Sequence, residues 1–217
     1  MNNNTQNVSI MNRFFVFCFL CFLVGHITGI AQPKSVDMGL SVRWAPYNIG
    51  ATSPYDYGDF YAWGETAVKT DYSAKTSKLK EYYTPKYYSR TGDLKTRMEY
   101  SDDAARQNWG GRWRIPTIEE WEELEKNCSW KWIWGKNGLN GYEVTSKING
   151  NSIFLPAAGF KWGISASNVR SIGRYWSSSK SKDDSLGYWG FMFDYKDVDG
   201  KTYSDHWAGL SVRPVLE

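Results

Sequence analysis

Histidine and cysteine, the side chains that most often supply metal ligands and nucleophiles, are scarce in this sequence. The 217 residues include 2 His and 3 Cys. Beyond residue 31 the sequence keeps only His206 and Cys128, so no His pair can ligate zinc and no disulfide can form within that part. A G-x-S-x-G nucleophile elbow is also missing. We therefore predict that the protein is not an enzyme and that it needs no cofactor and no metal.

A strong charge of either sign is missing too. The formal net charge is +3, so nothing in the composition favours nucleic acid as a partner. One apolar run, Phe14–Val24, is too short for a membrane-spanning helix, which needs roughly 20 residues. The small residues of Gly29–Ala31 follow it, as signal peptidase requires. Residues 1–31 are therefore predicted to be a secretory signal peptide that is cleaved after Ala31.

Export follows from this prediction, with the periplasm, the cell surface or the extracellular space as the destination. The mature chain is then residues 32–217, without a membrane span. The polar residues before the apolar run leave open that Met11 is the true start. A lipoprotein anchor is disfavoured, because neither Cys18 nor Cys21 has a small residue directly before it.

Aromatic residues and glycine are abundant, with 12 Trp, 15 Tyr, 10 Phe and 20 Gly. This composition indicates short strands, many turns and a core built from large rings. One helix is clearly marked: Pro116 prevents an earlier start, and Thr117 with Glu120 forms a capping box. The core positions expected around this helix are Trp113, Ile118, Trp121 and Leu124. Cys128 after the helix is interpreted as a small buried residue rather than a reactive thiol.

Acidic side chains fill the other faces of this helix, from Glu119 to Glu125. A pair of them could in principle serve glycoside hydrolysis. A solvated helix face explains the same pattern without catalysis, and that interpretation is favoured. A second, shorter helix is predicted over 101–109, with Ser101 as its N-cap.

Most of the remaining pattern is typical of strands. Residues 69–98 are polar and aperiodic and are expected to form a long surface excursion. Strands are predicted at 36–45, 130–134, 141–146, 152–156, 175–178, 188–195 and the C-terminus, with a hairpin turn at 135–138. In 188–195, alternation places Trp189, Phe191 and Phe193 on the core face. The sum is an α+β fold.

A Gly-Leu-Ser-Val-Arg sequence occurs twice, at 39–43 and at 209–213. It is too short for a solenoid repeat. We expect two strands of equivalent burial that lie near each other, so that the two ends of the chain meet in one sheet.

Several motifs in order resemble a known family. They are the segments 36–45, 110–124, 149–159, 175–178 and 211–215. Together they resemble the Fibrobacter succinogenes major paralogous domain over nearly all of 32–217, which would then be a single domain. The resemblance implies a C-type-lectin-like fold, related to the formylglycine-generating-enzyme and variable-lectin branch. In that fold two helices flank short, mostly antiparallel sheets and the terminal strands pair.

The resemblance implies surface recognition, with a binding face in the C-terminal region. Rings with nearby polar groups suit a glycan or a protein ligand. The predicted ligand-binding residues are Tyr175, Tyr188, Met192, Asp194, Tyr203, Asp205, His206 and Trp207. A structural subunit of a cell-surface assembly is the alternative. Formylglycine-generating chemistry is not carried over, because it needs a Cys pair and only Cys128 remains.

Asp197–Gly200 resembles the middle of a calcium loop. The template would place Tyr195 and His206 where a carboxylate and a bidentate Glu are required. The segment is therefore predicted to be a turn. The tripeptides of calcium-dependent sugar-binding lectins are also absent from the sequence, so calcium-dependent sugar binding is disfavoured.

Overall fold

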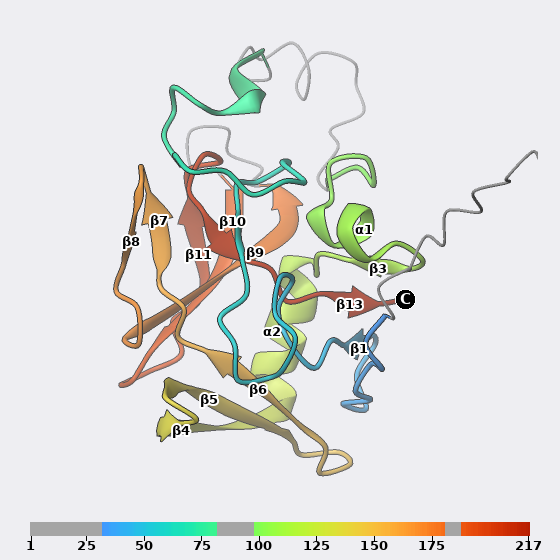
Figure 1. The fold of residues 1–217 in the computed structure, drawn as a ribbon. Helices are drawn as coiled ribbons and strands as arrows, with labels where there is room; N and C mark the ends of the chain where they lie inside the picture. Colours follow the sequence, from blue (N-terminus) through green and yellow to red (C-terminus); the bar gives the residue numbers. More distant parts are fainter. Residues whose placement is uncertain (1–31, 82–97, 181–187) are drawn as a thin grey trace, which may run out of the picture. The chain divides into compact units, whose positions relative to one another are not determined.

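Short strands account for most of the regular structure in the computed structural model, as the many Gly and aromatic residues lead one to expect (Figure 1). The structure describes residues 32–81, 98–180 and 188–217. The predicted signal peptide, residues 1–31, and part of the predicted surface excursion, residues 82–97, lie outside these ranges. Residues Ala31–Glu217 form one compact unit.

The described residues contain two α-helices and one 3₁₀ turn: α1 (Ala104–Trp109), α2 (Ile118–Asn127) and η1 (Lys78–Glu81). The strands are β1 (Arg43–Trp44), β2 (Phe60–Tyr61), β3 (Trp113–Arg114), β4 (Cys128–Lys136), β5 (Leu139–Ser146), β6 (Ser152–Pro156), β7 (Phe160–Trp162), β8 (Ser165–Ser167), β9 (Ile172–Lys180), β10 (Tyr188–Asp194), β11 (Gly200–Ser204), β12 (Leu210–Ser211) and β13 (Val215–Leu216). The fold class is α+β, with much more strand than helix.

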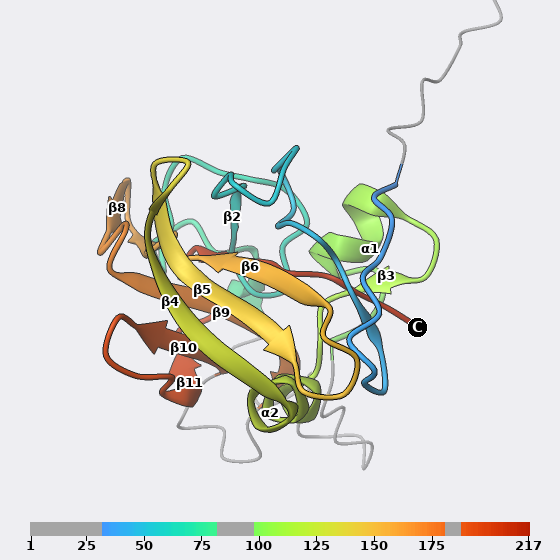
Figure 2. The ribbon, with the colours of Figure 1, turned by 90° about the horizontal axis from the view of Figure 1, so that it is seen from below.

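Four sheets organise these strands. A five-stranded sheet has the order β11-β10-β9-β12-β2, and a three-stranded sheet has the order β4-β5-β6. A second three-stranded sheet, β1-β13-β3, brings the first and last strands of the described chain together, and β7 and β8 form a ribbon. All strand pairs are antiparallel except β12 with β9. Figure 2 shows the curved β4-β5-β6 sheet and, at one end of it, α2, which leads directly into β4.

The larger core cluster lies where α2, the five-stranded sheet and the β4-β5-β6 sheet meet. Trp121 at its centre stacks on Phe191 of β10, with ring centroids 4.7 Å apart and planes 10° apart. Its indole nitrogen also donates to the carbonyl of Trp176 on β9. A ring of this size buries enough apolar area to contribute about 3 kcal/mol or more to stability.

The predictions for α2 are confirmed. Thr117 Oγ1 accepts from the backbone N–H of Glu120, and the Glu120 carboxylate accepts from the backbone N–H of Thr117, which completes the capping box. The four expected core residues are all at most 1% exposed: Trp113, Ile118, Trp121 and Leu124. The hairpin after β4 and the strands at 141–146, 152–156, 175–178 and 188–195 are also present.

Three expectations need correction. The shorter helix begins at Ala104, and its N-cap is Asp103 rather than Ser101, because the Asp103 carboxylate accepts from the backbone N–H groups of Ala105 and Arg106.

The described part of the predicted surface excursion is not wholly on the surface. Tyr72 and Leu79 are buried there.

The third correction concerns the repeated Gly-Leu-Ser-Val-Arg sequence. The two ends of the chain do meet in one sheet, since Arg43 in β1 pairs with Leu216 in β13. The two copies are not paired strands, because the second copy contains β12, which lies between β9 and β2 in the five-stranded sheet. Their burial is not equivalent. Arg43 is exposed and forms an ion pair with Asp37, whereas Arg213 is fully buried.

Candidate functional site

The predicted ligand-binding residues occupy several different environments. Tyr175 is fully buried in the larger core, where its hydroxyl donates to the carbonyl of Pro156 at 2.7 Å, so it is out of reach of a ligand. Tyr188 and His206 are buried as well. Tyr188 lies against Trp63, with ring centroids 4.1 Å apart. These three residues were expected on a binding face, and packing within the fold explains them instead.

Asp194 and Tyr203 lie nearer the surface, but on different elements: Asp194 ends β10 and Tyr203 lies in β11. Asp194 Oδ1 accepts from the backbone N–H groups of Lys196 and Asp197 and so shapes the turn after β10. Tyr203 stacks on Trp189 with ring centroids 3.8 Å apart. Trp189 is half-buried, so the expected core position is only partly correct for this residue.

Met192, Asp205 and Trp207 complete the predicted set. Met192 and Trp207 are half-buried and Asp205 is exposed. Met192 pairs across the sheet with Arg174, on the face opposite the Phe191–Tyr175 pair. Trp207 packs edge-on against the buried His206, with ring centroids 4.8 Å apart. The predicted residues therefore do not share one face.

Among the described residues, the most exposed pair of aromatic rings in contact lies elsewhere, near the end of β4. Trp134 is 66% exposed and Tyr195, directly after β10, is 47% exposed. Their ring centroids are 5.8 Å apart. Trp132 stands edge-on behind Trp134, with centroids 5.6 Å apart and planes 72° apart. We call Trp132, Trp134 and Tyr195 the Trp134 platform.

Local structure holds this platform in place. Alternation along β4 gives Trp130, Trp132 and Trp134 the same face, and Trp132 packs edge-on against Tyr142 of β5 at 5.1 Å. The Asp194 turn fixes the start of the segment that carries Tyr195. The rings of Trp134 and Tyr195 are thus presented to solvent from a well-packed base.

Two polar groups lie at the base of the platform. The indole N–H of Trp132 is buried and has no hydrogen-bond partner in the described structure. Burial raises the pKa of the Tyr142 hydroxyl, and the nearby carboxylates of Asp194, Asp197 and Asp199 raise it further. These carboxylates act on the Tyr142 hydroxyl, and Asp194 directly precedes Tyr195 of the platform in the chain. A carboxylate oxygen can accept a hydrogen bond from a hydroxylated ligand.

Sequence reasoning missed this platform, although a signal for it was present. The Trp residues at 130, 132 and 134 alternate toward a hairpin turn, and the last of them therefore sits at the end of the strand. Tyr195 is distant in sequence, and its contact with Trp134 depends on how the two sheets pack.

The other chemical candidates have structural roles. The carboxylate of Glu120 binds Arg114, and that of Glu123 accepts from the backbone and hydroxyl of Ser41. Asp197 turns the chain by accepting from the next backbone N–H. Over the described ranges, no three His, Cys, Asp or Glu side chains come close enough together to hold a metal ion.

Cys128 is buried at the start of β4. Burial raises the pKa of its thiol to about 11. The thiol therefore stays protonated near neutral pH and is a poor nucleophile. Its interpretation as a small buried residue is confirmed.

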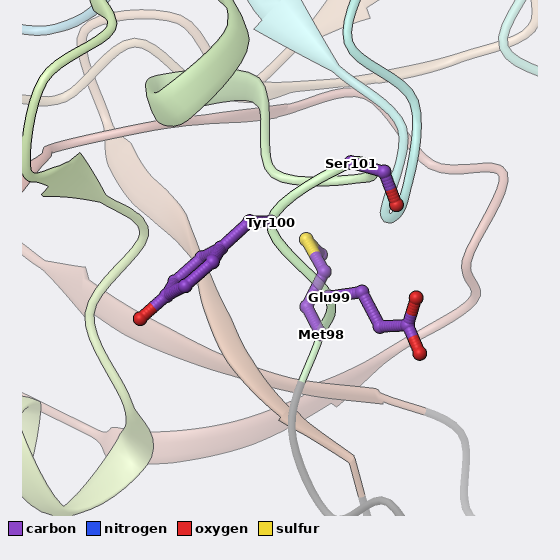
Figure 3. Close-up of a pocket in the computed structure, with 4 residues that line it drawn as sticks. All are labelled: Met98, Glu99, Tyr100 and Ser101. Atoms are coloured by element: carbon purple, nitrogen blue, oxygen red, sulfur yellow. The ribbon is translucent and has the colours of Figure 1, made fainter.

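A hollow of about 430 Å³ lies at Met98–Ser101. Figure 3 shows the side chains of Glu99 and Tyr100 pointing to opposite sides of the loop, so these two polar groups do not converge. The Tyr100 ring instead receives the Arg106 guanidinium, 4.6 Å from its centroid. Ligand sites need convergent polar groups, and the four described residues that line this hollow do not supply them.

In the part of the chain that the structure describes, no helix has the length and apolar character needed to cross a membrane. Comparisons with protein-family models, with curated proteins and with solved structures gave no match.

Proposed function

We propose that this protein is an exported recognition module that binds a glycan on the Trp134 platform. The observation that carries the proposal is the exposed pair of Trp134 and Tyr195, held by packed neighbours. Exposed indole and phenol rings offer flat contact area at a low cost in side-chain entropy. A sugar ring can stack its C–H face on them.

The surrounding groups favour a glycan over an apolar protein segment. Asp194 directly precedes Tyr195, and Asp197 and Asp199 follow it in the same connection between β10 and β11. A sugar presents hydroxyl donors, which can bond to these carboxylates. An apolar partner would leave the carboxylates desolvated without compensation.

The proposal includes a C-type-lectin-like fold and membership of the Fibrobacter succinogenes major paralogous domain family. Pairing of β1 with β13 and the position of α2 against the five-stranded sheet support the fold. The motifs in order support the family. Export rests on residues 1–31 and would be seen as a mature protein beginning at Gln32.

Binding can be measured on a glycan array and then by calorimetry with the best ligand. We expect Trp134→Ala and Tyr195→Ala each to weaken binding about tenfold or more, or about 1.4 kcal/mol. Trp162→Ala is a matched control, because Trp162 is 56% exposed on a different strand, β7. Unchanged glycan affinity in both platform variants would contradict the assignment of the site to the Trp134 platform. No binding to any glycan on the array would contradict the proposed function itself.

A docking role in a cell-surface assembly is the second candidate. It is favoured by the β7–β8 ribbon, where Trp162 is 56% and Ile164 is 77% exposed. A partner chain that binds this ribbon would be lost on Trp162→Ala and kept on Trp134→Ala. The two variants therefore separate the two functions in one pull-down from envelope extracts.

A further inference from the structure

Arg174 lies on the opposite face of the five-stranded sheet from the larger core. Its cross-strand neighbour on β10 is Met192, and its guanidinium carbon lies 5.0 Å from the centroid of the Phe160 ring on β7. Stacking on an aromatic ring fixes the plane of a guanidinium while leaving its N–H edges available.

The hydrogen bonding of Arg174 is incomplete. One terminal nitrogen donates to the carbonyl of Tyr203 at 3.3 Å, and the Nε atom is buried without a partner in the described structure. A guanidinium has five N–H donors in a planar fork. By contrast, Arg114 binds the Glu120 carboxylate with both terminal nitrogens, at 2.7 and 2.5 Å, and Glu217 through Nε at 2.6 Å.

Asp205 is the acidic neighbour of Arg174, but it does not neutralise the guanidinium by direct contact. Over the described ranges, no carboxylate oxygen lies within 4.0 Å of an Arg174 nitrogen. The two charges still influence each other: Arg174 lowers the pKa of Asp205 against the larger effect of burial, which raises it. The hydrogen bond from Arg174 to the carbonyl of Tyr203 brings the guanidinium to the end of β11, and the exposed Asp205 follows Tyr203 by two residues. A cation with unused donors and a carboxylate acceptor therefore lie in the same region.

We propose that Arg174 anchors a second binding site, for a ligand that carries a carboxylate next to hydroxyl groups, as a uronic acid does. The ligand carboxylate pairs with the free donors of the guanidinium, which match its planar geometry. Asp205 accepts hydrogen bonds from the ligand hydroxyls. The site is on a different face from the Trp134 platform, so the two can be tested separately.

The test is an NMR titration of the ¹⁵N-labelled protein, read at the arginine Nε–Hε signals. The ligands are glucuronic acid, glucose and inorganic sulfate at low ionic strength. We expect glucuronic acid to shift the Arg174 signal and to bind at least tenfold more tightly than glucose and sulfate. Equal binding of glucose would show that the carboxylate is not recognised, and equal binding of sulfate would show that any anion suffices; either result overturns the proposal.

Substitutions provide a second test of the Arg174 site. Arg174→Gln should abolish the preference for glucuronic acid over glucose, and Arg112→Gln, at an exposed arginine far along the chain, should keep it. If Arg174→Gln does not fold, Arg174→Lys is the second variant. It retains the positive charge but not the planar set of N–H donors, and it should lower the affinity for glucuronic acid at least fivefold. Binding that appears only in Asp205→Asn would mean that Asp205 closes onto Arg174 in the native protein, which contradicts the proposal.

Discussion

At the scale of single residues, Arg213 shows how a charge can hold a fold together from inside. Its guanidinium is fully buried and donates to the side chain of Asn48 and to the carbonyls of Ala45 and Phe154. Burial lowers its pKa to about 10, which still leaves it charged at neutral pH. The charged group thus ties the C-terminal segment to two other parts of the chain.

Replacing Arg213 by Met should leave those buried acceptors without a donor. Each unsatisfied buried group costs about 1–3 kcal/mol, so we expect a loss of about 3 kcal/mol or more. The matched control is Arg43→Met, in the other copy of the repeated sequence, where the exposed side chain should contribute less than about 1 kcal/mol. Urea unfolding of both variants measures the difference, and similar losses would contradict this account.

His206 makes stability depend on pH. Burial lowers its pKa from 6.5 to about 4, against the opposing effect of Glu65. Because the folded-state pKa lies below the unfolded value, stability is full above about pH 6.5 and is lost as the pH falls toward 4. The predicted loss between pH 7 and pH 5 is about 2 kcal/mol.

The check is urea unfolding at pH 7 and pH 5 for the wild-type protein and for His206→Gln. The variant lacks the titrating group, so its stability should change about 2 kcal/mol less between the two pH values. If both proteins lose the same amount of stability between pH 7 and pH 5, groups other than His206 cause the loss.

At the scale of elements, α2 is specified by its own sequence. The Thr117 hydroxyl and the Glu120 carboxylate satisfy backbone N–H groups at the helix start, and Glu120 also pairs with Arg114 on β3. The cap therefore does two tasks: it ends the strand-to-helix connection and fixes the helix against the β1-β13-β3 sheet.

Thr117→Ala should lower the stability by about 1 kcal/mol, the usual value for a lost N-cap. Glu120→Ala should cost more, about 2–4 kcal/mol, because it also leaves the buried guanidinium of Arg114 with one carboxylate fewer. Thermal unfolding compares these variants with Glu119→Ala, whose exposed side chain should matter by less than about 0.5 kcal/mol. A Glu120 variant as stable as Thr117→Ala would show that the ion pair contributes nothing.

Local sequence patterns predicted part of the fold. The helix α2, the β4–β5 hairpin and the core face of β10 each depend on residues that are close together in the sequence, so the sequence pattern predicts them. The exposure of Tyr175 and Tyr188 depends on which distant strand covers them, and no local pattern carries that information. Asp103 replaced Ser101 as the cap because its carboxylate also accepts from the backbone N–H of Ile115.

At the scale of the whole molecule, the last residues connect the sheets. β12 lies between β9 and β2 in the five-stranded sheet, and β13 lies between β1 and β3. Between them, Arg213 binds the carbonyl of Phe154 at 2.8 Å, on β6 of a third sheet. The C-terminal segment therefore completes the fold and is not an appendage.

The pairing of Arg43 with Leu216 has a consequence for chain connectivity. Because the first and last strands of the described chain are hydrogen-bonded neighbours, a short linker could join them without distorting either sheet. New ends could then open at the exposed Asn137–Gly138 turn, which lies at the tip of the β4–β5 hairpin. The topology is thus suited to circular permutation, with the order of elements changed and their packing preserved.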